Sequence, residues 1–361
     1  MRRYQKNHML NLVKTMMEAN DSVIKALPAA LGELDDVFVQ CQNAALQIGT
    51  YLETFGEIYR PIVADLEDYC ENVYKMSIST LDRNACRKLS KKIRKQLVEI
   101  NNLLWYGLPK DRKEVVFLPY KACMRDSLES VWKAADKDEN TDAYVIPIPY
   151  YDKNPDGSFG EAHYERELYP DYVPITRYDE YDFEGRRPDM IFIHNPYDSS
   201  NYVTSVHPFF YSSNLKNFTD QLIYIPYFVL GEPDADHEKA LDGIRHFCVT
   251  TGVFNADKVI VQSERMKKAY VKALTDFMKE HSGENTKEYW ENKILGLGSP
   301  KMDKVLTTRK EDVMVPEEWL KVIEKSDGSW KKIIFYNTSV QALLNHNEKM
   351  NAKIQDVLQV F

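Results

Sequence analysis

Polar side chains that could bind an anion follow several short apolar runs of the sequence, where buried strands are expected to end. Lysine and arginine can neutralise a phosphate, histidine can carry a proton, and serine and asparagine can hydrogen-bond to it. In an open parallel sheet, ligands bind at the carboxyl ends of the strands, so these side chains are candidates for one site. The candidates are Lys121, His194, Asn195, Asp198, Ser263, Arg265, Gly298, Ser299, Lys301, Asp303, Asn337, Thr338 and Ser339.

Three of these segments predict a particular local geometry. Ser263 is placed as the N-cap of a helix that has Arg265 in its first turn. Gly298 opens a tight turn that is followed by a cation and a carboxylate, and the segment 337–339 would present hydroxyls at a helix N-terminus, where a phosphate is stabilised. A purely structural role is the alternative for the serines and for His194, because serine is a common helix cap and His194 could be a buried structural histidine.

Six short apolar runs predict the strands that would position these side chains. They are 115–118, 144–148, 190–193, 222–225, 258–261 and 293–296. Amphipathic stretches separate most of them, notably 123–135 and 263–279, and a polar, tyrosine-rich loop is expected around residues 155–157. Alternation of strand and helix predicts an α/β domain with a doubly wound parallel sheet of the Rossmann type over residues 112–310.

Residues 1–107 are expected to form a helical bundle or a long helical hairpin. Apolar residues recur at steps of three and four over 34–55, 59–76 and 89–104, and a shorter basic helix is expected over 4–27. The basic run between Arg83 and Lys95 is interpreted as a solvated helix face, with contact to an anionic lipid surface as the alternative. We expect the protein to form a homo-oligomer through these helices.

The composition is that of a globular protein and argues against a nucleic-acid partner. The 361 residues include 47 Lys plus Arg and 55 Asp plus Glu, a net charge of −8, whereas phosphate backbones attract positive surfaces. Five widely spaced cysteines without a CxxC pair favour a cytoplasmic location over a disulfide framework. The eight histidines are scattered and the acidic segment 234–236 fits a helix N-terminus, so neither a metal nor a cofactor is expected.

Five segments of the chain resemble one protein family in content and in order. They are VVFLPYKACMRDSLESVW, PDMIFIHNPYD, NLKNFTDQLIYIPYF, DKVIVQSERMKKAY and GSPKMDKV. The family is that of the CDP-glycerol glycerophosphotransferase-like proteins, which are similar to the teichoic-acid polymerases of Gram-positive bacteria. The resemblance covers about residues 112–361 and implies the two-domain glycosyltransferase B fold. It is most specific over 298–303, which is similar to the family segment Gly-x-Pro-Arg/Lys-x-Asp.

The resemblance implies a transferase that acts in cell-wall teichoic-acid synthesis, with peripheral contact to the inner face of the membrane. A hydroxyl of a polyol-phosphate or glycolipid acceptor would attack the β-phosphorus of CDP-glycerol, or of another nucleotide-activated donor, and CMP would leave. The family motif His-Gly-Thr-Pro-Leu-Lys supplies the base. Aligned on the motif's Leu-Lys, this chain places Lys216 in the substrate site and Tyr211 at the position of the histidine. Since tyrosine is a poor base at neutral pH, His194 or His207 is the hypothetical replacement.

A last apolar run over 331–336, with a helix expected from there to 361, forms a lone βα unit within residues 311–361. The resemblance identifies this unit as the start of the donor-binding domain, most of which would follow residue 361. We therefore expect little transferase activity from this chain alone. The alternative is a non-catalytic scaffold that oligomerises through its helices and binds an anion in a degenerate transferase domain, which the replacement of the family histidine by Tyr211 favours.

Overall fold

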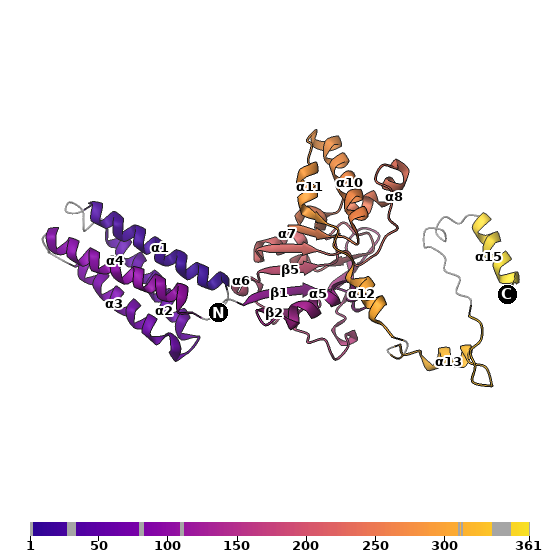
Figure 1. Ribbon diagram of the computed structural model, residues 1–361, viewed down its shortest axis with the longest axis horizontal. Helices are drawn as coiled ribbons and strands as arrows, with labels where there is room; N and C mark the ends of the chain where they lie inside the picture. Colours follow the sequence, from indigo (N-terminus) through magenta and orange to yellow (C-terminus); the bar gives the residue numbers. More distant parts are fainter. Residues whose placement is uncertain are drawn as a thin grey trace. The chain divides into compact units, whose positions relative to one another are not determined.

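The computed structural model describes residues 3–26, 34–78, 83–108, 112–309, 311, 313–333 and 348–360. The chain divides into two compact units, Met1–Leu306 and Thr307–Phe361. The first unit contains an N-terminal helical region and an α/β region built on a parallel sheet (Figure 1). The predicted fold class, N-terminal helices followed by a Rossmann-like α/β domain, is therefore confirmed.

The described part of residues 1–107 forms four helices around a shared core (Figure 1). They are α1 (Arg3–Ala26), α2 (Asp35–Glu53), α3 (Arg60–Ser77) and α4 (Arg83–Tyr106). Helices α1 and α3 each pack against both α2 and α4. Ile48, Leu97 and Ile100 are fully buried because the three-and-four spacing of apolar residues puts them on the inward faces of their helices.

In the described chain, the α/β region contains a six-stranded parallel sheet with the strand order β2-β1-β5-β7-β8-β9 (Figure 1). The strands are β1 (Lys113–Leu118), β2 (Thr141–Val145), β5 (Met190–Ile193), β7 (Gln221–Tyr224), β8 (Lys258–Ile260) and β9 (Ile294–Leu295). The helices are α5 (Asp126–Lys137), α6 (Phe183–Arg186), α7 (Ser212–Leu215), α8 (Glu238–Cys248), α9 (Thr251–Asn255), α10 (Glu264–Ser282), α11 (Lys287–Lys293) and α12 (Pro300–Thr307).

The central strands β1 and β5 are buried on both faces, which is why they appear in the sequence as continuous apolar runs, whereas the edge strand β2 keeps three half-buried residues. Val116 and Ile191 belong to the core on one face, whereas Phe117 and Phe192 belong to the core on the other. The rings of Phe117 and Phe192 stack with their centroids 4.8 Å apart. Successive side chains of one strand thus fill two separate cores.

The tyrosine-rich segment that was expected to be a loop contains strands instead. β3 (Tyr150–Lys153) pairs antiparallel with both β4 (Phe159–His163) and β6 (Thr204–Val206), in a sheet of its own. The turn between β3 and β4 is closed by the Asp156 carboxylate, which accepts hydrogen bonds from the amide and hydroxyl of Ser158, and Gly157 supplies the positive φ of 84°. Because the residues of β4 are exposed or only half buried, this strand lacks the apolar run that marks a buried strand.

The second unit contains helices α13 (Glu317–Ile323) and α15 (Glu348–Val360). Between them, Glu324 and Trp330 form an isolated antiparallel bridge across a turn. The expected strand 331–336 is not formed by Lys331, Lys332 and Ile333, and its remainder lies outside the described residues. None of the described helices combines the length and apolarity needed to cross a membrane.

The close packing of β9 against α10 generates a test of the fold. A Cβ atom added at Gly296 would lie 2.6 Å from backbone atoms of Ser263 and Glu264, whereas one added at Gly243, within α8, would meet nothing within 4 Å. We expect Gly296→Ala to lower the free energy of unfolding by about 2 kcal/mol through overpacking. Gly243→Ala should raise it by about 0.5–1 kcal/mol, because alanine is the better helix former.

Urea unfolding followed by circular dichroism measures both changes. Equal effects of the two substitutions would contradict the packing of β9 on the first turn of α10.

Candidate functional site

The strand order of the parallel sheet reverses direction between β1 and β5. From β1 the chain crosses outward to β2, and from β5 it crosses the other way to β7, while Leu118 and Ile193 pair side by side at the carboxyl ends of the two strands. In doubly wound sheets such a switch point is where ligands bind, because the loops that follow the two strands diverge. The side chains at these two strand ends therefore define the candidate site.

Five side chains gather at this end of the sheet, and we call them the strand-end cluster. They are Tyr120, Lys121, Tyr150, Glu165 and Tyr227. The ring of Tyr120 packs edge-on against Tyr150, with centroids 5.4 Å apart, and against Tyr227, with centroids 6.2 Å apart. The cluster is thus assembled from the loop after β1, from β3, from the segment after β4 and from the loop after β7.

Lys121 supplies the positive charge of the strand-end cluster. Its Nζ lies 4.9 Å from the ring centroid of Tyr150 and 5.7 Å from that of Tyr120. Within the described residues, no carboxylate forms an ion pair with this half-buried ammonium group. Aromatic faces stabilise a cation without neutralising it, so the charge of Lys121 is available to an anionic ligand.

Glu165 fixes the geometry around Lys121. Its Oε1 accepts a hydrogen bond from the Tyr150 hydroxyl at 2.6 Å, and its Oε2 accepts one from the backbone N–H of Ala122 at 2.7 Å. Burial, and then the hydrogen bond to Glu165, raises the pKa of Tyr150. Tyr150 is therefore a neutral hydroxyl at physiological pH, held in a fixed direction by a carboxylate that spans two segments.

A second set of hydroxyls lines the same strand ends. The Tyr227 hydroxyl is hydrogen-bonded to those of Tyr120 and Tyr197, and burial raises the pKa of all three tyrosines. Neutral phenols both donate and accept hydrogen bonds. These three hydroxyls can therefore hydrogen-bond to phosphate oxygens or to the hydroxyls of a polyol.

His194 follows β5 directly but is sealed beneath the cluster. It has no exposed surface, its Nε2 accepts the backbone N–H of Tyr120 at 3.0 Å, and its Nδ1 lies 2.8 Å from the Ser127 hydroxyl oxygen. Ser127 donates its own proton to the carbonyl of Met124, so Nδ1–H is the donor to Ser127. The geometry argues against the predicted role of His194 as a catalytic base, because neither ring nitrogen can reach a substrate.

The two polar residues that follow His194 shape the loop after β5. Asn195 is buried, and its side-chain oxygen accepts the N–H of Tyr197 at 3.0 Å. Asp198 is buried with a positive φ of 48°, and its carboxylate accepts hydrogen bonds from the amide and the hydroxyl of Ser212, at 2.9 and 2.6 Å. Both side chains, predicted to bind substrate, are thus engaged in local structure.

The two other predicted catalytic residues lie near β6. The Nδ1 of His207 accepts the N–H of Phe209 at 3.2 Å. The Tyr211 hydroxyl is hydrogen-bonded to that of Ser205 at 2.8 Å. Both side chains thus have a hydrogen-bond partner within the fold, and their predicted catalytic role stays a prediction.

Lys216 lies at the opposite edge of the sheet from the strand-end cluster. Its Nζ is 3.4 Å from the carboxylate of Asp257 and 3.3 Å from the carbonyl of Asn255, and both residues directly precede β8. The amino ends of the parallel strands meet at this edge. The structure therefore does not bring Lys216 together with Lys121.

The residues predicted after β8 and β9 lie near one another, at the carboxyl ends of those strands. Ser263 caps α10 by accepting the N–H of Met266 at 3.0 Å, and the Nε of Arg265 donates to the carbonyl of Pro233 at 3.2 Å. Gly298 has a φ of 117°, which favours glycine, and Ser299 holds a buried hydroxyl without a partner among the described residues. Gly298 and Ser299 border a small pocket.

Lys301 and Asp303 join α12 to α5. Lys301 Nζ lies 2.8 and 2.9 Å from the two carboxylate oxygens of Asp126, and Asp303 accepts a hydrogen bond from Ser130 at 2.7 Å. Their charges are thus used in helix packing. The remaining predicted ligands, Asn337, Thr338 and Ser339, lie outside the described residues.

Four members of the strand-end cluster were missed by the sequence reasoning: Tyr120, Tyr150, Glu165 and Tyr227. Tyr120 and Tyr227 follow β1 and β7 within three residues, so the rule that selected Lys121 would also have selected them. Tyr150 begins β3 and Glu165 follows β4, and no sequence signal placed them at this site.

No family model matches the chain, and no curated protein matches it.

The buried state of His194 predicts a pH dependence of stability. Burial lowers the pKa of His194 to about 3, so the folded state keeps the ring neutral while the unfolded chain takes up a proton below about pH 6.5. The stability that this group contributes is present above pH 6.5 and is lost as the pH falls. Between pH 7 and pH 5 the loss should be about 2 kcal/mol.

His194→Gln should flatten that part of the profile of unfolding free energy against pH, measured by urea unfolding. His246→Gln, which replaces an exposed histidine of α8, serves as the control and should keep the wild-type slope. An unchanged slope in His194→Gln would show that the imidazole is not held neutral.

Proposed function

We propose that this protein is a CDP-glycerol glycerophosphotransferase-like transferase that binds the phosphate of its substrate at the strand-end cluster. The donor would be CDP-glycerol or another nucleotide-activated alcohol, and the acceptor a polyol-phosphate or glycolipid. The order of sequence segments and the Rossmann-like parallel sheet support this proposal.

The observation that carries the proposal is the state of Lys121. Among the charged residues predicted at the site, Lys216, Lys301 and Asp303 are paired with protein groups, whereas the Lys121 ammonium rests on two tyrosine rings at the switch point. Phosphoryl transfer depends mainly on positioning and on positive potential at the phosphate. Lys121 supplies that potential, and the tyrosine hydroxyls supply directional hydrogen bonds.

In the proposed reaction, an acceptor hydroxyl oxygen forms a bond to the β-phosphorus of the donor. The bond from that phosphorus to the bridging oxygen breaks, CMP leaves with the electron pair, and the hydroxyl proton passes to a base. The burial of His194 and its two hydrogen bonds argue against this role for it. The role of Lys121 in this reaction would be to stabilise the negative charge on the phosphate oxygens.

A second candidate function is that of a non-catalytic, anion-binding protein. The observation that favours it is that His194, His207 and Tyr211 are all engaged as hydrogen-bond partners within the fold. Release of CMP from CDP-glycerol in the presence of a polyol-phosphate acceptor would exclude this candidate.

Membrane contact and self-association through the helices belong to the same proposal. Arg87, Lys88 and Lys91 are exposed on α4 and form no ion pair with another described residue, whereas Arg94 pairs with Asp21 and Lys95 with Glu99. Exposed basic side chains that are not neutralised by an ion pair can attract anionic lipid headgroups.

The proposed binding site is tested by comparing two lysines at opposite edges of the sheet. Lys121→Ala should weaken the binding of glycerol phosphate, the repeating unit of a polyol-phosphate acceptor, by about tenfold or more, because a charge-assisted contact is lost. Lys121→Arg should restore part of the affinity, since it keeps the positive charge. Lys216→Ala, at the amino edge, should leave the affinity unchanged.

Isothermal titration calorimetry at low ionic strength measures all four proteins. The site would be misplaced if Lys216→Ala weakened binding as much as Lys121→Ala does.

A further inference from the structure

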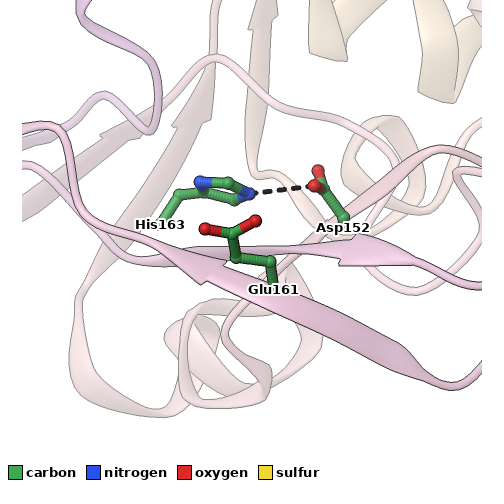
Figure 2. Close-up of side chains that lie close together, drawn as sticks. All are labelled: Asp152, Glu161 and His163. Carbon is green, nitrogen blue, oxygen red and sulfur yellow. Dashed lines mark hydrogen bonds and ion pairs between the residues drawn. The ribbon is translucent and has the colours of Figure 1, made fainter.

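The hairpin of β3 and β4 brings together three metal-ligating side chains that the strand-end cluster does not use. They are Asp152 of β3 and Glu161 and His163 of β4, and one ligand atom from each lies within 4.8 Å of the others. Figure 2 shows the carboxylate of Glu161 beside the imidazole of His163, with Asp152 facing both. Among the described residues, this is the one group of three or more such side chains at this spacing.

The backbone of the hairpin explains why these side chains share a face. Glu161 and His163 are two residues apart on one strand, so both point to the same side of the sheet. His163 pairs with Tyr150 and Ala162 with Tyr151, so the alternation of side chains along β3 puts Asp152 on the same side as His163.

The three side chains differ in how firmly they are held. The ring of His163 stacks on that of Tyr150, with centroids 4.9 Å apart, and its Nε2 lies 2.9 Å from the Asp152 carboxylate. Glu161 is exposed and has neither a hydrogen-bond nor an ion-pair partner among the described residues. The hairpin thus holds two adjacent carboxylates with a single imidazole, which leaves a negative charge uncompensated.

We propose that Asp152, Glu161 and His163 form a binding site for a divalent transition-metal ion, zinc or manganese. Ligand atoms around tetrahedral zinc lie about 3.4 Å apart, given bonds of about 2.1 Å. The Asp152–His163 pair is already closer than this, and the exposed Glu161 side chain can rotate to complete the set. Mixed imidazole and carboxylate ligands favour zinc or manganese over magnesium, which prefers oxygen alone.

Three protein ligands leave at least one coordination position open to water or to a ligand oxygen. The stacked ring of Tyr150 restricts the orientation of the His163 ring. The proposal does not depend on the transferase function, because it rests on residues outside the strand-end cluster.

The test uses the untagged full chain and metal binding itself as the readout. Manganese binding is followed by the loss of the electron paramagnetic resonance signal of free Mn²⁺, and zinc binding by calorimetry. Manganese is included because the exposed thiol of Cys123 could capture zinc. We expect one ion per chain and a weaker response to Mg²⁺.

Glu161→Gln is the sharpest variant, because this side chain makes no contact that the fold depends on. It should lower the affinity at least tenfold and abolish the rise in melting temperature that the metal causes in the wild type. His163→Gln and Asp152→Asn should act in the same direction, and Glu167→Gln, which replaces a nearby exposed carboxylate, should bind as the wild type does. Absence of one-to-one binding in the wild type, or wild-type affinity in Glu161→Gln, would overturn the proposal.

Discussion

The α/β region depends on the buried, neutral imidazole of His194, which lies where the strand order of the sheet reverses. His194 accepts the backbone amide of Tyr120 and donates to Ser127, so one side chain joins the end of β5 to the loop after β1 and to the start of α5. Burial of an imidazole without charge is tolerated only because both nitrogens are satisfied. The positions of Tyr120 and Lys121, and with them the strand-end cluster, follow from this arrangement.

Around that point, polar groups have two distinct roles. Asp198, Ser263 and Lys301 stabilise turns, caps and helix contacts, and their hydrogen-bonding capacity is used within the fold. Lys121 rests on aromatic rings and keeps its charge. This difference separates side chains that build the site from those able to act on a ligand.

Much of the fold was predictable from the sequence because the central strands of the parallel sheet are buried on both faces. The predicted runs overlap all six parallel strands, but the run 144–148 shares only Tyr144 and Val145 with the half-buried edge strand β2, and β4, exposed along much of its length, gave no apolar run. The site was less predictable. A rule about strand ends located Lys121 and His194 equally well, but burial and hydrogen bonds that only the fold shows distinguish them. The partner of Lys301 is 175 residues away in the chain, beyond the reach of any local pattern.

That last separation affects how the protein can form during synthesis. Asp126 lies near the start of the α/β region and Lys301 near its end, and the ion pair joins helices that border the first and last strands made. A nascent chain therefore exposes one side of α5 to solvent or to chaperones until α12 has left the ribosome. Contacts between residues so far apart in the sequence slow folding. The contact of α5 with α12 can form only after all six strands of the parallel sheet have been translated.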